Sequence, residues 1–264
     1  MLLSFTSDFG TRDAYVAAVK GVLLTRAPGL QIVDVSHEIP PGDVGAGAYV
    51  LAQAAREFPP GTLHLAVVDP GVGSERRAVA CRGAESIFVG PDNGLLPLAL
   101  EDRGGIEAFE LTRPELRMER VSPVFHGRDL FAPAVAWLAA GGRLEEVGPS
   151  FSPSSLVPTP WPHVERVGRS LRGEVIYVDR FGNLVTNIRL ASVDAQTGGH
   201  ASVAEHVLPL VRSYADAADG TLIALVGSAG LLEIACSRGS ASERLSAERG
   251  LVVSYTARAG GQLV

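Results

Sequence analysis

The chain has 264 residues, which exceeds the usual size of one hydrophobic core and favours two domains. An apolar fraction of 46% with 20% charged residues is typical of a folded globular protein and excludes a disordered one. The formal net charge of −6 argues against a nucleic-acid partner, because phosphate backbones are bound by clustered Lys and Arg.

The amino-terminal segment MLLSFTSDFG lacks the basic start and the long apolar run of a signal peptide. No stretch approaches the roughly 18 apolar residues of a membrane-spanning helix, so the sequence predicts a cytoplasmic protein with no membrane partner. Cys81 and Cys236 are far apart and lack CxxC spacing, which favours buried free thiols over a disulfide or a metal site.

The first half of the chain alternates short apolar runs with helical patterns. After the first run, Val16, Val19 and Leu23 recur at helical spacing until Pro28 and Gly29 end the helix. The expected strands are residues 2–6, 31–35, 62–68, 78–81 and 86–89, and the expected helices are 16–27, 44–55, 95–101 and 130–140. This βαβ order predicts an α/β domain, Rossmann-like, over residues 1–150, with parallel strands and covering helices.

A proline-rich stretch with several serines follows this domain. Its composition cannot form a regular element, so residues 151–169 are interpreted as an extended linker. Beyond it the pattern changes to strands separated by glycine-rich turns, at residues 173–178, 184–188, 221–226, 231–235 and 251–256. Residues 170–264 are therefore expected to form a small β-barrel or sandwich.

Acidic residues follow three of the expected strands. Asp8 ends the first, Asp69 ends the third in VVDPGVG, and Asp92 follows another apolar run in FVGPDNG. Each by itself is equally well explained as a turn former or a helix N-cap. Open α/β sheets bind ligands at the carboxyl ends of their strands, so three such residues together indicate a ligand site.

The segment from Asp69 to Gly73 is followed by two arginines. Its glycines permit close backbone approach to a ligand, although it matches neither a dinucleotide-binding fingerprint nor a phosphate-binding loop. Arg76 and Arg77 are near enough for one guanidinium to fold back onto Asp69. A solvated surface pair is the competing interpretation of these arginines.

Three histidines differ in their context. His126, in FHGRD before the Ala-rich helix, is flanked by glycine at a loop-to-helix junction and suits proton transfer near neutral pH. His37, in DVSHEIP, is a weaker candidate. His64 alternates within an expected strand and is interpreted as structural.

Seven ordered motifs between residues 4 and 240 resemble the adenosine-forming S-adenosylmethionine hydrolases, relatives of the fluorinating and chlorinating enzymes that attack the same substrate with halide. These motifs are SDFGTRDAYV, DVSHEIPPGD, VVDPGVGSERR, GPDNGLL, FHGRDLFAPAVA, DRFGNLVTNI and GSAGLLEIA.

The resemblance implies an N-terminal α/β domain and a C-terminal β-barrel in a homotrimer that binds substrate between neighbouring subunits. S-adenosyl-L-methionine would be split by water into adenosine and L-methionine, with no cofactor and no metal. The family's hydrolytic residues match Asp69, Arg76 and His126. In the halogenating relatives the positions of Asp69 and His126 carry other side chains, which favours water as the nucleophile.

The same resemblance assigns substrate contacts. Asp8 would hold the ribose hydroxyls, and Phe181 and Asn183 would bind the adenosine. Asp179 and Ser228 would bind the methionine end of the substrate. Glu233 and the backbone near Arg238 would lie at the adenine edge. Two positions depart from the family pattern. Ser74 stands where Thr is commoner, and Ala229 stands where a halogenating relative carries Arg, so the contacts of the methionine carboxylate are expected to differ.

A sulfonium leaves as a neutral thioether, so attack at C5′ needs a positioned nucleophile and no general acid. Asp69 and His126 are expected to hold the water and accept its proton while Arg76 orients the carboxylate, and which of the two accepts the proton is left open.

Three other functions are alternatives to a hydrolase. They are a nucleophilic halogenase, a non-catalytic adenosine or S-adenosylmethionine sensor, and a metal-dependent phosphohydrolase with Asp8, Asp13, His37 and Asp69 as ligands.

Overall fold

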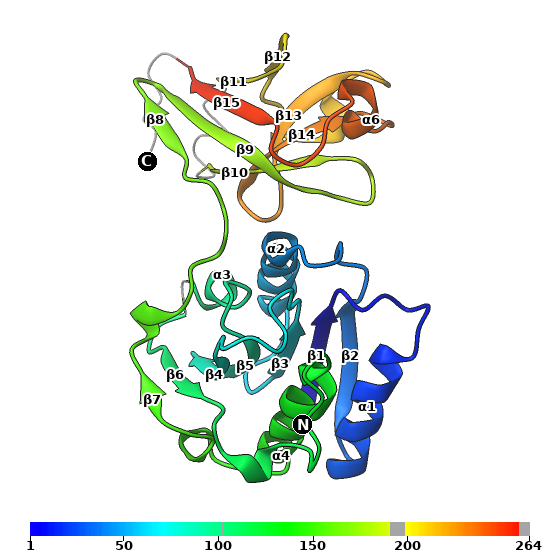
Figure 1. Cartoon of the computed structure of the whole chain (residues 1–264). Helices are drawn as coiled ribbons and strands as arrows, with labels where there is room; N and C mark the ends of the chain where they lie inside the picture. The colour runs from blue at the N-terminus through cyan, green and yellow to red at the C-terminus, as the bar shows by residue number, and fades with distance from the viewer. Residues whose placement is uncertain (102, 191–198, 259–264) are drawn as a thin grey trace. The chain divides into compact units, whose positions relative to one another are not determined.

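The computed structural model describes residues 1–101, 103–190 and 199–258. The chain divides into two compact units, Met1–Pro160 and Trp161–Val264 (Figure 1). No helix in these described ranges is long and apolar enough to cross a membrane.

The N-terminal unit contains a mixed seven-stranded sheet in the order β2-β1-β3-β5-β4-β6-β7. Its strands are β1 (Leu2–Ser7), β2 (Gln31–Ser36), β3 (Leu63–Val67), β4 (Ala78–Gly83), β5 (Ser86–Pro91), β6 (Glu107–Glu110) and β7 (Ser150–Phe151). β1 pairs in parallel with β2 and β3, and β3 pairs in parallel with β5, whereas β4 is antiparallel to both β5 and β6. The parallel strands therefore direct their carboxyl ends to one edge of the sheet.

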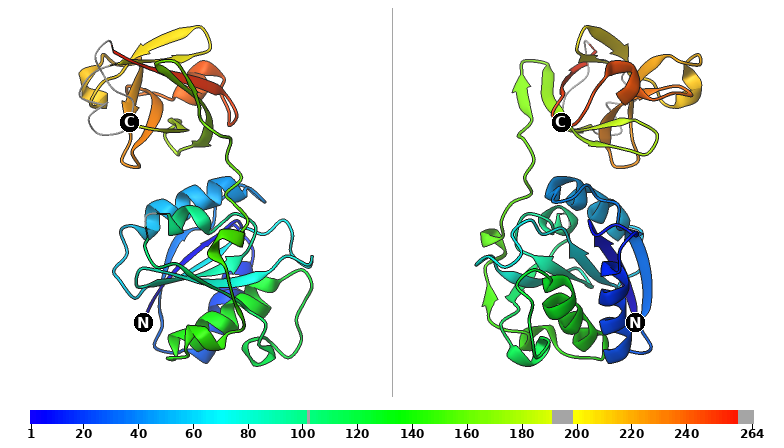
Figure 2. Two further views of the ribbon diagram at one scale, coloured as in Figure 1. Left: turned by 90° about the vertical axis from the view of Figure 1, so that its left-hand side faces the viewer. Right: turned by 45° about the vertical axis from the view of Figure 1, so that its right-hand side comes forward.

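Helices cover both faces of this sheet (Figure 2). They are α1 (Tyr15–Arg26), α2 (Val44–Ala55), α3 (Pro97–Leu100) and α4 (Ala132–Ala139). α1 packs with α4 on one face, where Val19, Leu23 and Val135 are buried against strand residues such as Phe5. α2 packs with α3 on the other face. Gly47 of α2 permits close packing on Val68, after β3, and Leu95, before α3, because a Cβ there would lie 2.9 Å from side-chain atoms of both.

The C-terminal unit is an antiparallel sheet that curls into a nearly closed barrel, in the order β12-β11-β15-β9-β10-β14-β13 with β8 beside β9. Its strands are β8 (Glu165–Val167), β9 (Ser170–Val178), β10 (Leu184–Arg189), β11 (Gly199–Val203), β12 (His206–Pro209), β13 (Leu222–Val226), β14 (Leu231–Cys236) and β15 (Val252–Ala257), and one helix is α6 (Ala241–Leu245). A bridge between Leu210 and Ala224 joins the ends of the sheet. Val175, Leu184, Ile234 and Tyr255 lie in its core.

Parts of the proline-rich stretch make specific contacts. Ser150–Phe151 forms β7 beside β6, and Glu165–Val167 forms β8 beside β9. Between them, the Val157 N–H donates to the buried carboxylate of Asp92 over 2.9 Å. Arg77 donates to the same carboxylate over 2.7 Å and stacks on the Phe151 ring at 4.1 Å. Asp92 and Arg77 therefore fasten this stretch to the N-terminal sheet.

The expected fold class is confirmed, with an α/β unit followed by a β-barrel. The expected strands and helices of the first half are present, with ends displaced by a few residues. The sequence did not predict β6, β7, β8, β11, β12 or α6, because these short elements have exposed positions and little apolar periodicity.

Candidate active site

Asp69 lies just beyond the carboxyl end of β3, where the chain turns away from the sheet. Arg76 folds back onto it, as the sequence suggested: its Nε donates to Asp69 Oδ1 over 2.8 Å and its Nη2 donates to Oδ2. The two side chains are only 10% and 5% exposed. A two-point contact of this kind fixes the plane of the carboxylate as well as its position.

The glycines between these residues allow the loop to make this turn. Gly73 has a φ of +81°, in the left-handed region that glycine adopts readily. A Cβ on Gly73 would lie 2.5 Å from the carbonyl oxygen of Pro123, so the loop packs directly against the segment that leads to His126. The sequence VVDPGVG therefore brings two distant parts of the chain together.

His126 begins an irregular first turn of the Ala-rich helix. Residues Gly127–Phe131 form a π-helical turn before α4 begins at Ala132. The His126 Nδ1 lies 3.0 Å from Arg76 Nη2. Because a guanidinium only donates hydrogen bonds, Nδ1 is the acceptor, and the neutral ring then carries its proton on Nε2. Burial and the nearby Arg76 charge lower the pKa of His126, which favours this neutral form.

Arg76 thus joins Asp69 and His126 through one guanidinium. The three side chains come from separate segments: the end of β3, the following loop and the start of the π-helical turn. The ring of Phe131 supports the guanidinium at 5.4 Å.

A small pocket of about 60 Å³ opens beside this group. Its polar walls are Asp8, Asp69 and His126, and its apolar walls are Phe9, Val67, Val72, Val124 and Phe125, with Gly127. The volume accommodates a few water molecules or one small group, whereas pockets for drug-sized ligands are about 300–1,000 Å³. The sequence had not identified the apolar walls, which come from three separate segments.

Asp8 follows β1 and reaches the same pocket. One of its oxygens accepts the Gly42 N–H over 2.8 Å, which fixes the carboxylate beside the loop that precedes α2. Asp92, the third strand-end acid, is not among the residues that line this pocket and is engaged by Arg77 and Val157 instead.

The remaining histidine candidates have other partners. His37 is buried, with its Nδ1 2.7 Å from Ser7 Oγ and its Nε2 3.2 Å from Asp34 Oδ1. Ser7 is fully buried, so this Ser-His-Asp arrangement offers no accessible nucleophile. His64 is buried and stacked on Phe88, and burial lowers its pKa to about 4. Asp13 is exposed, and the described part of the chain contains no group of three or more metal-ligating side chains.

The C-terminal unit brings together several of the expected substrate-binding residues. The turn between β9 and β10 holds Asp179, whose Oδ1 accepts the N–H groups of Phe181 and Asn183 over 2.9 Å. The Asn183 side chain donates to Asp179 Oδ2 over 2.8 Å and to the Tyr214 hydroxyl over 3.2 Å. Tyr214 was not identified from the sequence, because it lies in a segment with no motif.

Glu233 in β14 belongs to the same cluster. It is 8% exposed, and desolvation together with the Asp179 charge raises its pKa to about 7. The other three predicted residues are exposed. Ser228 lies in the turn between β13 and β14, Phe181 is 76% exposed, and Arg238 extends toward Asp219 at 3.3 Å.

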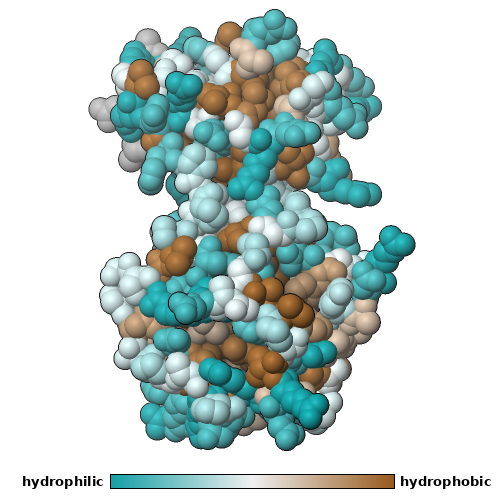
Figure 3. Space-filling model, in the orientation of Figure 1, coloured by the Kyte–Doolittle hydropathy of each residue, from teal (hydrophilic) through white to brown (hydrophobic). Residues whose placement is uncertain are grey.

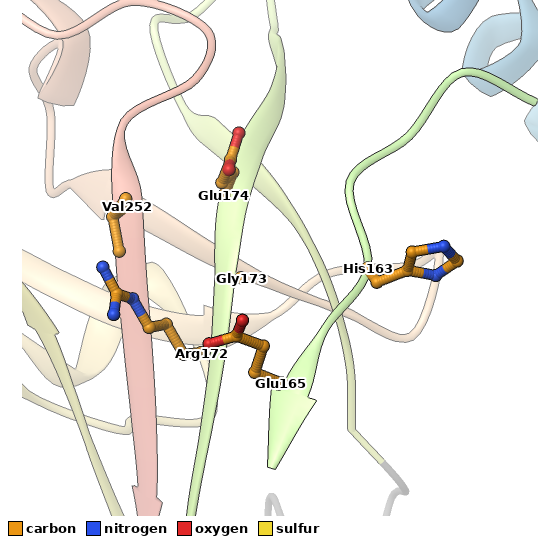
Figure 4. Close-up of a pocket in the computed structure, with 6 residues that line it drawn as sticks. All are labelled: His163, Glu165, Arg172, Gly173, Glu174 and Val252. Carbon is orange, nitrogen blue, oxygen red and sulfur yellow. The ribbon is translucent and has the colours of Figure 1, made fainter. Parts of the chain in front are cut away.

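A pocket of about 210 Å³ in the C-terminal unit lies near β8 and β9 and contains none of the predicted residues (Figure 4). It is lined by His163, Glu165, Arg172, Gly173, Glu174 and Val252. Figure 4 shows Glu165 and Arg172 near each other, while the His163 ring points away from them. We assign no chemistry to this mixed-charge surface.

Comparisons with known proteins cover nearly the whole chain. The model of the SAM hydroxide adenosyltransferase N-terminal domain matches residues 3–148, and that of the C-terminal domain matches residues 173–254. An (R)-S-adenosyl-L-methionine hydrolase of Salinispora arenicola is 42% identical over 97% of both chains. Another, of Thermus thermophilus, is 44% identical over 94% of this chain and 97% of the relative. A fluorinase of Actinoplanes is 32% identical over 97% of both chains.

Solved structures agree with these matches. A crystal structure of an uncharacterized conserved protein from Thermotoga maritima has a TM-score of 0.87 and 35% identity, over 96% of this chain and 99% of the other. A conserved hypothetical protein from Thermus thermophilus has a TM-score of 0.78 and 41% identity, over 96% and 98%. Sequence and fold together show that this chain belongs to the SAM hydroxide adenosyltransferase family.

Proposed function

We propose that this protein hydrolyses S-adenosyl-L-methionine to adenosine and L-methionine. The observation that carries the proposal is the guanidinium of Arg76, which joins Asp69 and His126 beside a pocket large enough for a few water molecules. The hydrolases among the relatives are 42% and 44% identical to the chain, and the fluorinase is 32% identical, which favours water over halide.

In this proposal the pocket holds the attacking water beside C5′ of the substrate. Asp69 accepts a hydrogen bond from the water, and the Nε2–H of neutral His126 donates one to its oxygen. As the C5′–O bond forms, the water proton passes to Asp69 and the electrons of the C5′–S bond leave with sulfur. Holding the water in line at about 3 Å contributes part of the roughly 7–11 kcal/mol available from orientation.

The tautomer of His126 supports Asp69 as the proton acceptor. Arg76 donates to Nδ1, so the neutral ring presents a donor on its other nitrogen and has no free lone pair for a proton. The lowered pKa of His126 keeps the ring neutral near pH 7. Asp69 is therefore the group whose lone pair is available to accept the proton of the water.

The remaining contacts follow from the positions of the other side chains. Asp8 has one oxygen engaged by Gly42 and is proposed to use the other for the ribose hydroxyls. Asn183 uses its amide N–H groups on Asp179 and Tyr214, which leaves its oxygen for the adenine amino group. The exposed Phe181 ring would stack on the base, and Asp179 and Ser228 would hold the methionine end.

We further propose a homotrimer in which the C-terminal unit of one subunit completes the pocket of another. The pocket of the N-terminal unit is much too small for the whole substrate. Hydrophobic residues reach the surface of both units (Figure 3). Among the exposed large hydrophobic side chains are Val124, beside the pocket at 75% exposure, and Phe181. The two cysteines are free and buried, which supports action in the reducing cytoplasm.

Incubation with S-adenosyl-L-methionine in ¹⁸O-labelled water tests the hydrolase. The expected products are adenosine and methionine in equal amounts, with the label on the 5′ oxygen of adenosine. Halide-dependent formation of a 5′-halogenated nucleoside would identify a halogenase instead. Binding without any product would identify a sensor, and loss of turnover on chelation would favour a metal-dependent enzyme.

A further inference from the structure

Strand β1 carries two buried serines, and each of them is hydrogen-bonded to a buried histidine. Ser4 Oγ lies 2.6 Å from His64 Nδ1, and Ser7 Oγ lies 2.7 Å from His37 Nδ1. All four residues are at most 4% exposed. The pairs share their chemistry and differ in their place in the sheet. Ser4 and His64 lie opposite each other in the regular pairing of β1 with β3, whereas Ser7 ends β1 and His37 follows the end of β2.

The loop between β2 and α2 holds the segment after β1 at three points. The first is the His37 side chain, which contacts the Ser7 hydroxyl. The second is the His37 carbonyl, which accepts the Gly10 N–H over 2.7 Å. The third is the Gly42 N–H, which donates to Asp8 Oδ2 over 2.8 Å. Two of these points belong to His37, and its side chain supplies one that another residue could not replace with its backbone.

The segment that is held in this way forms part of the candidate active site. Asp8 and Phe9 both line the pocket of the N-terminal unit, whereas His37 is not among the lining residues. The Phe9 N–H donates to Ser7 Oγ over 3.3 Å, so the hydroxyl that contacts His37 also fixes the backbone just after Asp8. His37 therefore reaches the pocket through Ser7 and through the backbone of this segment.

The ring of His37 is held in one orientation. Its Nε2 lies 3.2 Å from Asp34 Oδ1, and the ring packs edge-on against Phe5 with the centroids 4.6 Å apart. A carboxylate only accepts hydrogen bonds, so the proton of the neutral ring lies on Nε2 and Nδ1 accepts from the Ser7 hydroxyl. The Ser7 oxygen then keeps a lone pair for the Phe9 N–H.

We propose that His37 is a positioning residue for substrate binding, which fixes the Asp8 carboxylate through Ser7. This inference rests on the proposed function, in which Asp8 binds the ribose hydroxyls. Loss of Nδ1 leaves the buried Ser7 hydroxyl without its acceptor, which is costly, so the segment after β1 is expected to shift. A shifted carboxylate binds the ribose less well, because hydrogen bonds weaken steeply with distance and angle.

Two variants of His37 test the contact with Ser7. His37→Leu removes the acceptor, so the KM for S-adenosyl-L-methionine should rise about tenfold, with a smaller change in kcat. His37→Asn places an amide oxygen near the position of Nδ1 and loses the contact with Asp34, so its KM should stay within about threefold of that of the unmodified enzyme. A KM for His37→Asn as high as that for His37→Leu would overturn the inference.

The other Ser-His pair supplies the matched control. His64→Leu removes an equivalent buried acceptor from Ser4 on the same strand, and neither residue lines the pocket. This variant should lower the Tm, as His37→Leu should, and leave the KM unchanged. A similar rise in KM for both leucine variants would show a general disturbance of the sheet and would contradict a specific role of His37.

A double-mutant cycle tests whether His37 acts through Asp8. His37→Leu should raise the KM about tenfold in the unmodified enzyme and less than about twofold in Asp8→Asn, because the carboxylate that it positions is then absent. Independent, additive effects of the two substitutions on the free energy of binding would exclude this route.

Failure of this inference is distinguishable from failure of the proposed function, because adenosine release by the unmodified enzyme tests the function separately. If no adenosine is released, calorimetric titration with adenosine and with 2′,3′-dideoxyadenosine makes the comparison without turnover. The unmodified protein and His64→Leu should prefer adenosine, and His37→Leu should lose most of this preference. An unchanged preference in His37→Leu, or no preference in the unmodified protein, contradicts the inference.

Discussion

At the scale of single residues, the candidate active site depends on Arg76, since its guanidinium contacts both of the other two members. It holds the Asp69 carboxylate at two points and occupies Nδ1 of His126. The positive charge of Arg76 lies between the Asp69 carboxylate, which accepts its hydrogen bonds, and the His126 ring, which burial and this charge keep neutral. In the proposed reaction the two polar groups beside the water therefore have different roles, one accepting and one donating a hydrogen bond.

Substitutions at Asp69 and His126 are expected to have unequal effects. Asp69→Asn retains the size of the side chain and removes the proton acceptor, so kcat should fall by about 10²–10⁴-fold. His126→Gln retains an N–H donor near the position of Nε2, so its kcat should fall by only about tenfold. Single-turnover rates of adenosine formation measure both. A larger loss for His126→Gln than for Asp69→Asn would assign the proton to the histidine.

Glu233 is expected to make the stability of the protein depend on pH. Its pKa of about 7 in the folded state is above the ordinary value of 4.5, so the folded state binds this proton more tightly than the unfolded state. The resulting stabilisation is complete below about pH 4.5 and is lost as the pH rises through about 7. Glu233→Gln should therefore match the parent Tm near pH 5 and exceed it by a few degrees near pH 8.

Calorimetric melting at several pH values checks this expectation. Glu248→Gln, which changes an exposed carboxyl, should follow the parent at every pH. A Tm of Glu233→Gln that stays below that of the parent at pH 8 would show that the ionised carboxylate is stabilised in the free enzyme.

At the scale of elements, the site is assembled where loops meet beyond the carboxyl ends of β1 and β3. The loop after β3 reaches the segment before His126 only because Gly73 has no side chain to meet Pro123. The π-helical turn Gly127–Phe131 follows, and turns of this kind occur frequently at functional sites. The same loop carries Arg76 toward the pocket and Arg77 toward Asp92.

Gly73→Ala is expected to lower both activity and stability. The change forces a Cβ against the Pro123 carbonyl and a residue with a side chain into a φ of +81°. The displaced loop should reduce kcat more than tenfold, because a shift of about 1 Å in a catalytic group costs about 10²-fold. Gly141→Ala is the matched control, since Gly141 has a φ of +95° and nothing within 4 Å of its Cβ position. Both should lower the Tm, and only Gly73→Ala should lower kcat.

At the scale of the whole molecule, each unit holds only part of what the proposed substrate requires. The N-terminal unit supplies the water-sized pocket, and the C-terminal unit supplies the cluster of Asp179, Asn183, Tyr214 and Glu233. A substrate with a nucleoside, a sulfonium and an amino acid is much larger than the pocket of the N-terminal unit. A shared site between subunits therefore predicts that activity depends on assembly.

Mixing two inactive variants tests this shared site. If one subunit supplies Asp69 and its neighbour supplies Asp179, random trimers of Asp69→Asn and Asp179→Asn subunits contain intact sites. Each site has a one-half chance of each intact partner, so about a quarter of the wild-type activity should return after the subunits are unfolded and refolded together. No recovery in a mixture shown to contain mixed trimers would place both residues in a site within one subunit.

The sequence by itself determined the two-unit organisation, the α/β and barrel classes, and the strand-end acids. These depend on local periodicity and on turn residues, which act within a few positions of the chain. It also indicated that an arginine would fold back onto Asp69, because the two residues are only seven positions apart. Asp69, Asp8 and His126 were identified as candidates for the same reason, from their positions at the ends of expected elements.

Only the tertiary structure decided which of these candidates come together. It placed Arg76 between Asp69 and His126, turned Asp92 toward Arg77 and the proline-rich stretch, and enclosed His37 with Ser7 and Asp34. It also placed Tyr214 beside Asn183 and buried Glu233 near Asp179. These contacts join residues that are up to 65 positions apart, and they follow from strand order and loop packing. The periodicity of residues along the chain carries no information about strand order or about loop packing.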